Sequence, residues 1–171
     1  MKQLLLPFTE HVEMDAITEA VVLASLFKTG LIALSLIRIP GIGQKRKVRL
    51  EYIQQSQDFL EAIRHKARRY EIQVQPVELY THDAARSIHT FAHEMDCTGI
   101  LLFTSESVPL LLNAGEVQWL MERETLPLFL TQLKTREFRF PWQRWMARRS
   151  AQQQTPIPQI ISVQNILPTS H

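Results

Sequence analysis

Small polar side chains gather in one stretch of the sequence, directly after an apolar run. Thr104, Ser105 and Ser107 follow the run GILLF in the segment 99–117, GILLFTSESVPLLLNAGEV. An apolar strand, a polar loop and a new helix in succession are typical of the carboxyl edge of an open α/β sheet, where ligands bind. With Thr9, which follows an earlier apolar run, these hydroxyls would form a polar pocket for a small molecule. Loop hydroxyls also bond their own backbone, so both interpretations stay open.

Three other side chains have the chemistry of a site but lack the surroundings that it needs. His89 and His93 are four residues apart, close enough on a helix to share a metal ion, yet they do not form an HExxH motif and no third ligand is evident. We expect them to lie on the polar flank of a surface helix. Cys97 has no adjacent base that would lower its pKa, so we expect a buried thiol and not a nucleophile. The sequence therefore predicts no metal site and no enzyme.

Two basic segments point toward anionic partners. Lys45-Arg46-Lys47 with Arg49 form a cationic loop, which is either solvated or in contact with phosphate or an anionic surface. Residues 1–133 hold 13 Lys/Arg against 16 Asp/Glu, a net −3, whereas residues 134–171 hold six against one, a net +5. The basic tail also interleaves arginines with large apolar side chains, namely Phe138, Phe140, Trp142, Trp145 and Met146.

Such mixtures suit membrane surfaces and nucleic acids, but aromatic side chains also fold back onto the body or a partner subunit. Because the body is acidic, we predict no nucleic-acid partner and keep membrane contact through 134–149 open. One cysteine excludes an internal disulfide and fits a reducing compartment. No signal pattern and no apolar run near the ~20 residues of a membrane span are visible. We therefore expect a cytoplasmic protein.

Apolar runs and helical stripes alternate along the first 133 residues, which predicts a parallel sheet with helices on both faces. Pro76 favours an edge position for the third strand. Asp83 is a good helix N-cap, Asn113 with Glu116 resembles a capping box, and Gly30 would close the first helix. The inward face of the third helix would be Ala85, Ile88, Ala92 and Met95. We expect strands over 3–8, 31–39, 72–80, 99–104 and 126–133, helices over 15–28, 51–70, 84–95 and 114–123, and one more strand or docking segment over 160–167.

Five segments, in order and at the right separations across residues 2–133, resemble the universal stress protein family. They are LLPFT (5–9), TGLIAL (29–34), HDAARSI (82–88), CTGILLFT (97–104) and LPLFL (126–130). The resemblance implies an open five-stranded parallel sheet of order 3-2-1-4-5 over 1–133, followed by a basic aromatic C-terminal extension over 134–171. It also implies a homodimer through the last strand, at Leu128, Phe129 and Leu130.

ATP-binding members of that family carry Gly-x2-Gly-x9-Gly-(Ser/Thr) after the fourth strand, where the glycines let the backbone approach the phosphates. The chain departs from this pattern. Phe103 and Glu106 replace the first two glycines, and Thr9 stands where the family has Asp. Asn113-Ala114 or Gly115-Glu116, depending on the alignment, stand at the third site, and neither pair offers a hydroxyl. A phosphate there would also meet the like charge of a Glu in the first helical turn.

The sequence thus predicts a regulatory or binding protein that is non-catalytic, holds no cofactor and acts through dimerisation and contacts with an unknown protein partner. One alternative is an adenine-nucleotide-binding protein that takes ATP or AMP through a rearranged loop. A second is a cytoplasmic regulator of a membrane transporter that docks through its basic tail. A ligand pocket at the sheet edge would be lined by Pro7, Phe8, Thr9, Phe103, Thr104, Ser105, Ser107, Asn113 and Gly115.

Overall fold

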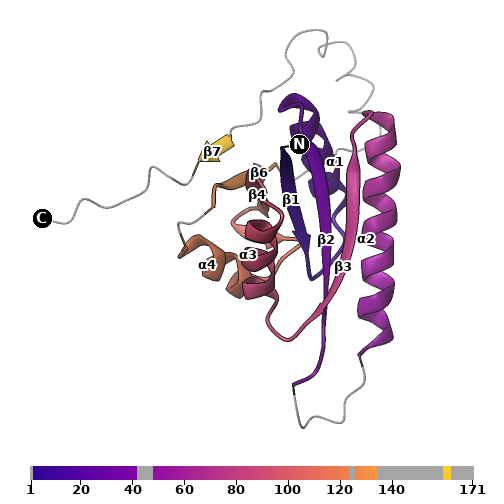
Figure 1. Ribbon diagram of the computed structural model, residues 1–171, viewed down its shortest axis with the longest axis vertical. Coiled ribbons are helices and arrows are strands. Elements are labelled where there is room, and N and C mark those ends of the chain that lie inside the picture. The colour runs from indigo at the N-terminus through magenta and orange to yellow at the C-terminus, as the bar shows by residue number, and fades with distance from the viewer. Residues whose placement is uncertain (1, 42–47, 124–125, 135–159, 163–171) are drawn as a thin grey trace, which may run out of the picture.

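A computed structural model describes residues 2–41, 48–123, 126–134 and 160–162 of the chain (Figure 1). Strands and helices alternate through most of this length, as the apolar pattern predicts. The strands are β1 (Gln3–Phe8), β2 (Gly30–Arg38), β3 (Val74–Thr81), β4 (Gly99–Ser105), β5 (Val108–Leu110), β6 (Leu128–Leu133) and β7 (Ile160–Ser162). The helices are α1 (Met14–Leu26), α2 (Leu50–Arg69), α3 (Ala84–Glu94) and α4 (Ala114–Met121).

Five of the strands form a parallel sheet in the order β3-β2-β1-β4-β6. This is the predicted order, since β6 is the fifth strand that the sequence indicates. β3 lies at one edge, which explains how Pro76, with no N–H to donate, is accommodated in a strand. The predicted fold class is therefore confirmed.

The sheet separates two apolar cores, and β1 contributes to both. Leu4, Leu6 and Phe8 point into the core that α1 and α2 cover, whereas Leu5 points into the core that α3 and α4 cover. All four side chains are at most 2% exposed. A strand that is buried on both faces favours apolar residues at every position, and this is why Leu4–Phe8 is continuously apolar. Helices on opposite faces are visible in Figure 1.

Two antiparallel strands extend the parallel sheet. β5 forms a hairpin with β4, in which Phe103 lies opposite Leu110. The sequence analysis treated this stretch as a polar loop and missed the strand. β7, which comes from the C-terminal extension, pairs with the outer edge of β6. It falls within the segment 160–167 for which a further strand was one of two predictions.

Two local predictions were wrong. Gly30 does not close α1; it is the first residue of β2, and Lys28 takes the left-handed conformation after the helix with φ of 51°. Met95 does not face inward, because α3 ends at Glu94 and Met95, as its C-cap, is 37% exposed. By contrast, the Asp83 cap is confirmed: its carboxylate accepts the N–H of Arg86 at 3.1 Å. Lys45-Arg46-Lys47 and the aromatic–arginine segment 135–149 lie outside the described residues.

Candidate functional site

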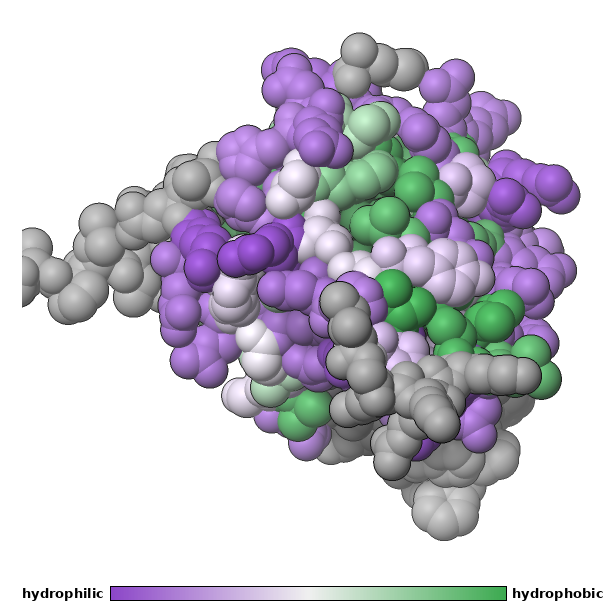
Figure 2. All heavy atoms as spheres, turned by 60° about the horizontal axis from the view of Figure 1, so that its bottom comes forward, coloured by the Kyte–Doolittle hydropathy of each residue, from purple (hydrophilic) through white to green (hydrophobic). Residues whose placement is uncertain are grey.

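The carboxyl ends of β1 and β4 diverge at the centre of the sheet. Their pairing is limited to Leu4 with Gly99 and Leu5 with Ile100. Beyond these pairs β1 ends at Phe8, while β4 continues to Ser105. The chain leaves the two strands in opposite directions across the sheet, so this is the topological switch point at which open α/β sheets bind ligands. The end of the molecule turned toward the reader in Figure 2 is mixed in character, with an apolar band between hydrophilic side chains.

The β5 hairpin and the residues after it are bound to the end of β1 at this point. The carbonyl of Leu111 accepts the backbone N–H of Thr9 at 2.8 Å and that of Glu10 at 3.1 Å. The side chains of Leu111 and Leu112 are each 3% exposed. Leu111 has φ of 68°, a left-handed conformation that is uncommon for a bulky residue. Backbone and leucine side chains therefore lie against the end of β1, where a ligand would approach.

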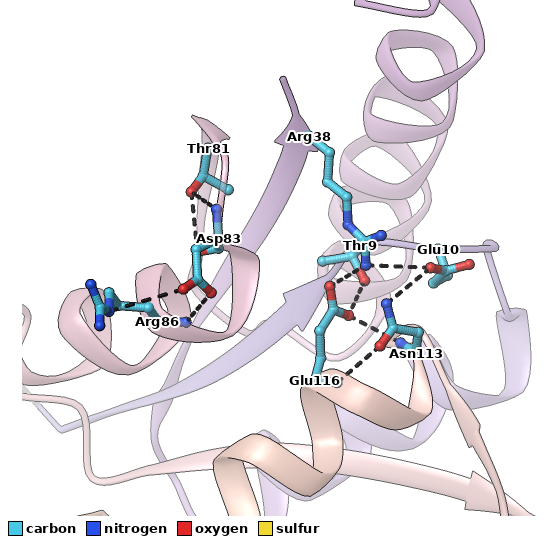
Figure 3. A network of polar contacts seen from close by, with 8 residues as sticks. All are labelled: Thr9, Glu10, Arg38, Thr81, Asp83, Arg86, Asn113 and Glu116. Atoms are coloured by element: carbon cyan, nitrogen blue, oxygen red, sulfur yellow. Dashed lines mark hydrogen bonds and ion pairs between the residues drawn. The ribbon is translucent and has the colours of Figure 1, made fainter. Parts of the chain in front are cut away.

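A buried carboxylate completes this closure. Asn113 and Glu116 form the predicted capping box of α4: Asn113 Oδ1 accepts the N–H of Glu116 at 2.9 Å, and Glu116 Oε2 accepts the N–H of Asn113 at 3.0 Å. The hydroxyl of Thr9 donates to the same Oε2 at 2.5 Å. Arg38 Nη2 donates to Glu116 Oε1 at 2.5 Å. Figure 3 shows that these side chains converge from β1, β2 and α4.

The network carries one positive and two negative charges. The Glu116 side chain is 7% exposed and the Arg38 side chain 43%. Glu10 contributes the second carboxylate, with Oε1 at 3.6 Å from Arg38 Nη2 and 3.4 Å from Asn113 Nδ2. Partial burial lowers the pKa of Arg38, but its hydrogen bond to Glu116 and the charge of that carboxylate outweigh burial and leave the pKa raised. Arg38 therefore stays charged, and the cluster has a net charge of −1.

The structure places the predicted pocket residues in different surroundings. Thr9 and Asn113 meet in the network around Glu116. The remaining residues are buried, partly exposed or exposed. Pro7, Phe8 and Phe103 are buried, Thr104 and Ser105 are partly exposed at the end of β4, and Ser107 and Gly115 are exposed.

Sequence reasoning missed Arg38 and Glu10. Arg38 is the one charged residue in the run LIALSLIRI, and a charge at the end of a buried strand is the signal that could have identified it. Its partner Glu116 is 78 residues away in the sequence, and only the order of the strands brings the two together.

The histidines and the cysteine lie away from this site. The rings of His89 and His93 are 4.7 Å apart, and His89 also contacts the ring of Trp119 at 5.9 Å. Burial, followed by the charges of His93 and Arg123, lowers the pKa of His89. Cys97 is 4% exposed, as predicted, and burial with the nearby charge of Asp96 raises its pKa. The described ranges contain no group of three or more His, Cys, Asp or Glu residues arranged to hold a metal ion.

Comparison with known proteins finds matches by structure but none by sequence. No family model and no curated protein matches the sequence. Among solved structures, a universal stress protein family member from Burkholderia pseudomallei aligns with a TM-score of 0.59 and 13% identity, over 75% of this chain and 94% of that one. The chain has the universal stress protein fold. Two similar structures contain ligands: the Archaeoglobus fulgidus universal stress protein in complex with dAMP (TM-score 0.56, 13% identity, 76% of this chain and 97% of that one) and a universal stress protein in complex with cAMP (0.54, 12%, 75% and 95%).

This likeness to the universal stress proteins covers 75–76% of the chain, and identities of 12–13% establish the fold alone. Within the fold, the switch point of this chain holds the β5 hairpin and the Glu116 network. No helix in the described ranges is both long and apolar enough to cross a membrane.

Proposed function

We propose that this chain is a non-catalytic binding protein with the universal stress protein fold, which does not hold ATP in the manner that the sequence resemblance implies. The observation that carries this proposal is the buried carboxylate of Glu116 at the N-terminus of α4. A helix N-terminus attracts anions through its free N–H groups and its dipole. In this chain a side chain of the protein itself accepts such an N–H, that of Asn113.

A phosphate group would have to displace that carboxylate or bind beside it. Displacement breaks the bonds that Glu116 accepts from Thr9, Arg38 and the Asn113 N–H. Binding beside it brings like charges together, at about 4 kcal/mol for an isolated pair 4 Å apart with an effective dielectric constant of 20, a repulsion that the charge of Arg38 offsets in part. Glu10 adds a second repulsive charge. Both routes oppose phosphate binding.

The same contacts support a non-catalytic role. The hydroxyl of Thr9 donates to Glu116, which is the arrangement of a nucleophile and its base. The oxygens of that carboxylate are already engaged, however, by the guanidinium of Arg38 and by the backbone N–H of Asn113. The thiol of Cys97 is buried with a raised pKa, which lowers its thiolate fraction at neutral pH.

Isothermal titration calorimetry with ATP and AMP tests the proposal. We expect no binding heat at nucleotide concentrations up to about 1 mM, and no nucleotide in the mass spectrum of the denatured protein. Glu116→Gln is the matched variant, since it keeps the shape of the side chain and removes its charge. Micromolar binding of either nucleotide to the unmodified chain would overturn the proposal.

That result would favour the alternative function, an adenine-nucleotide-binding protein with a rearranged loop. The observation in its favour is that two proteins with the same fold are solved in complex with dAMP and cAMP.

In the proposed non-catalytic role, the chain acts through protein contacts. These contacts include a homodimer that forms along β6 at Leu128, Phe129 and Leu130, and a further protein partner. Sedimentation velocity of the full chain from about 1 to 200 µM measures self-association.

The third candidate, docking to a transporter at the membrane through residues 134–149, rests on a segment outside the described residues. Co-sedimentation with anionic liposomes tests it, and equal recovery with neutral liposomes would dismiss it.

A further inference from the structure

The outer edge of β6 is occupied by a strand from the same chain. β7 runs antiparallel to β6, with Phe129 opposite Ser162, Leu130 opposite Ile161 and Thr131 opposite Ile160. Figure 1 shows β7 at the margin of the sheet, beyond β6. An edge strand otherwise leaves its N–H and C=O groups open to any extended chain that comes near. β7 therefore covers two of the three residues through which the proposed dimer would form, Phe129 and Leu130.

The pairing between β6 and β7 is the shorter of the two that β6 makes. β6 pairs with β4 through six residues, from Leu128 to Leu133, but with β7 through three. The two strands are also separated by residues 134–159, which is far longer than the two to five residues of a typical hairpin loop. Closing a connection of this length lowers the effective concentration of its ends. Among the described strands of the sheet, β7 is thus suited to leave and return.

The edge beneath β7 is apolar and suited to a second copy of itself. Leu128 and Leu130 pack against the core under α3 and α4, and Phe129 and Leu133 against the core under α1 and α2. Two β6 strands placed antiparallel about a two-fold axis would present the same residues to one another, as an isologous interface requires. A second copy and β7 need the same backbone groups, so they cannot both pair with Phe129–Thr131.

We propose that β7 is an internal cap on the edge of β6 and that it competes with a second copy of the chain for this edge. The inference rests on the proposed function in one respect, the dimer along β6, and adds the element that regulates it. While β7 is paired, the edge is closed and the chain is monomeric. When β7 leaves, the edge is open and two chains associate.

The test compares three full-length proteins: the unmodified chain, Ile161→Pro and Gln153→Pro. Proline at position 161 removes an N–H from the centre of β7 and disfavours strand pairing. Position 153 is in the same connection but outside β7, so Gln153→Pro is the matched control. Sedimentation velocity should show Ile161→Pro forming dimers at a concentration at least about tenfold lower than the other two proteins. Ile161→Asp, which keeps the N–H but places a charge in the strand, should act in the same direction.

Hydrogen exchange on the same samples identifies the edge that is involved. At concentrations where all three proteins are monomeric, the amide of Leu130, which faces β7 while those of Phe129 and Thr131 face β4, should exchange several-fold faster in Ile161→Pro than in Gln153→Pro. The Leu130 amide should become protected again when Ile161→Pro dimerises.

Three results would overturn the proposal that β7 caps the edge of β6. Equal dimerisation of all three proteins would retain the dimer but leave β7 without a role in it. A dimer of the unmodified chain that Ile161→Pro dissolves would show that β7 links two copies. Monomers throughout, with unchanged exchange at β6, would refute both the cap and the dimer of the proposed function, while the conclusion about nucleotides would still stand on calorimetry.

Discussion

The ion pair between Arg38 and Glu116 should contribute measurably to stability, and Arg38→Met isolates that contribution. Methionine keeps most of the aliphatic length of the side chain and removes the charge. Glu116, with 7% of its side chain exposed, then keeps the bonds from Thr9 and Asn113 but has lost the guanidinium that balances its charge. Removing one partner of a buried ion pair typically costs about 3–5 kcal/mol, because the other charge is left uncompensated.

The exposed Arg38 side chain reduces this figure. Because 43% of that side chain is in contact with solvent, water can replace part of the charge stabilisation that the guanidinium gives the carboxylate. We therefore expect Arg38→Met to lower the free energy of unfolding by about 1–3 kcal/mol, between the values for exposed and buried pairs. For a chain of this size each kcal/mol corresponds to roughly 2–4 °C in Tm.

Urea and thermal unfolding of Arg38→Met, Glu116→Gln and the double variant, followed by circular dichroism at pH 7, measures the effect. The double variant should cost less than the sum of the single variants, with a coupling of about 1 kcal/mol or more. Arg86→Met is the control, because Arg86 and Asp83 lie 4.0 Å apart on the surface and are 76% and 56% exposed; it should change stability by less than about 0.5 kcal/mol. Equal effects of Arg38→Met and Arg86→Met, with an additive double variant, would refute the argument that the network holds Glu116 in place.

Three further outcomes are expected. Gly99→Ala should destabilise the fold by about 1–3 kcal/mol in urea unfolding, because a Cβ there would lie 2.2 Å from the Phe129 ring and 2.9 Å from the Pro127 carbonyl oxygen. Adding Phe129→Leu should recover part of the lost stability. If it recovers none, the Phe129 ring is not the source of the clash. Burial raises the pKa of Glu19, so its stability contribution is present below the unfolded-state pKa and is lost as pH rises through the folded-state pKa. Glu19→Gln should therefore be more stable than the unmodified chain at pH 7 and no more stable near pH 3, as unfolding at a series of pH values will show. Cys97, buried and with a raised pKa, should react with a thiol reagent at pH 7 at least about tenfold more slowly in the folded than in the urea-unfolded chain, and equal rates would contradict its burial.

The strands of the sheet were accessible from the sequence because the central ones are buried on both faces, whereas their order was predicted only from the resemblance to the universal stress protein family. Such strands are dominated by apolar residues, so LLLPF and GILLF stand out as apolar runs between amphipathic helical stripes. The capping box at Asn113 was accessible for a different reason: the residues that make it are three apart, and their bonds are local. Both kinds of signal depend on residues that are close together in the chain.

The β5 hairpin and the Arg38 contact were not accessible in this way. The β4–β5 turn places Glu106 and Ser107 at φ of 48° and 69°, positions where a two-residue turn usually has Asn or Gly. Because the turn contains neither Asn nor Gly, the sequence does not indicate a hairpin before the three-residue strand VPL. Arg38 and Glu116 meet only after the sheet and α4 have formed. Spacing in the sequence therefore indicates the scaffold of this site but not the way in which it is closed.

A single backbone conformation links the two parts of that closure. Left-handed backbone costs a non-glycine residue roughly 1–2 kcal/mol, yet Leu111 adopts φ of 68°. Its carbonyl accepts two N–H groups from the end of β1, and its side chain is 3% exposed, a burial that contributes about 1.5–3 kcal/mol. These contacts offset the strain. Because Leu111 is two residues before the N-cap Asn113, the same turn that binds the hairpin to β1 also starts α4 where Glu116 reaches Thr9 and Arg38. The hairpin and the buried carboxylate thus close the switch point as one unit, and a ligand that entered it would have to disturb both.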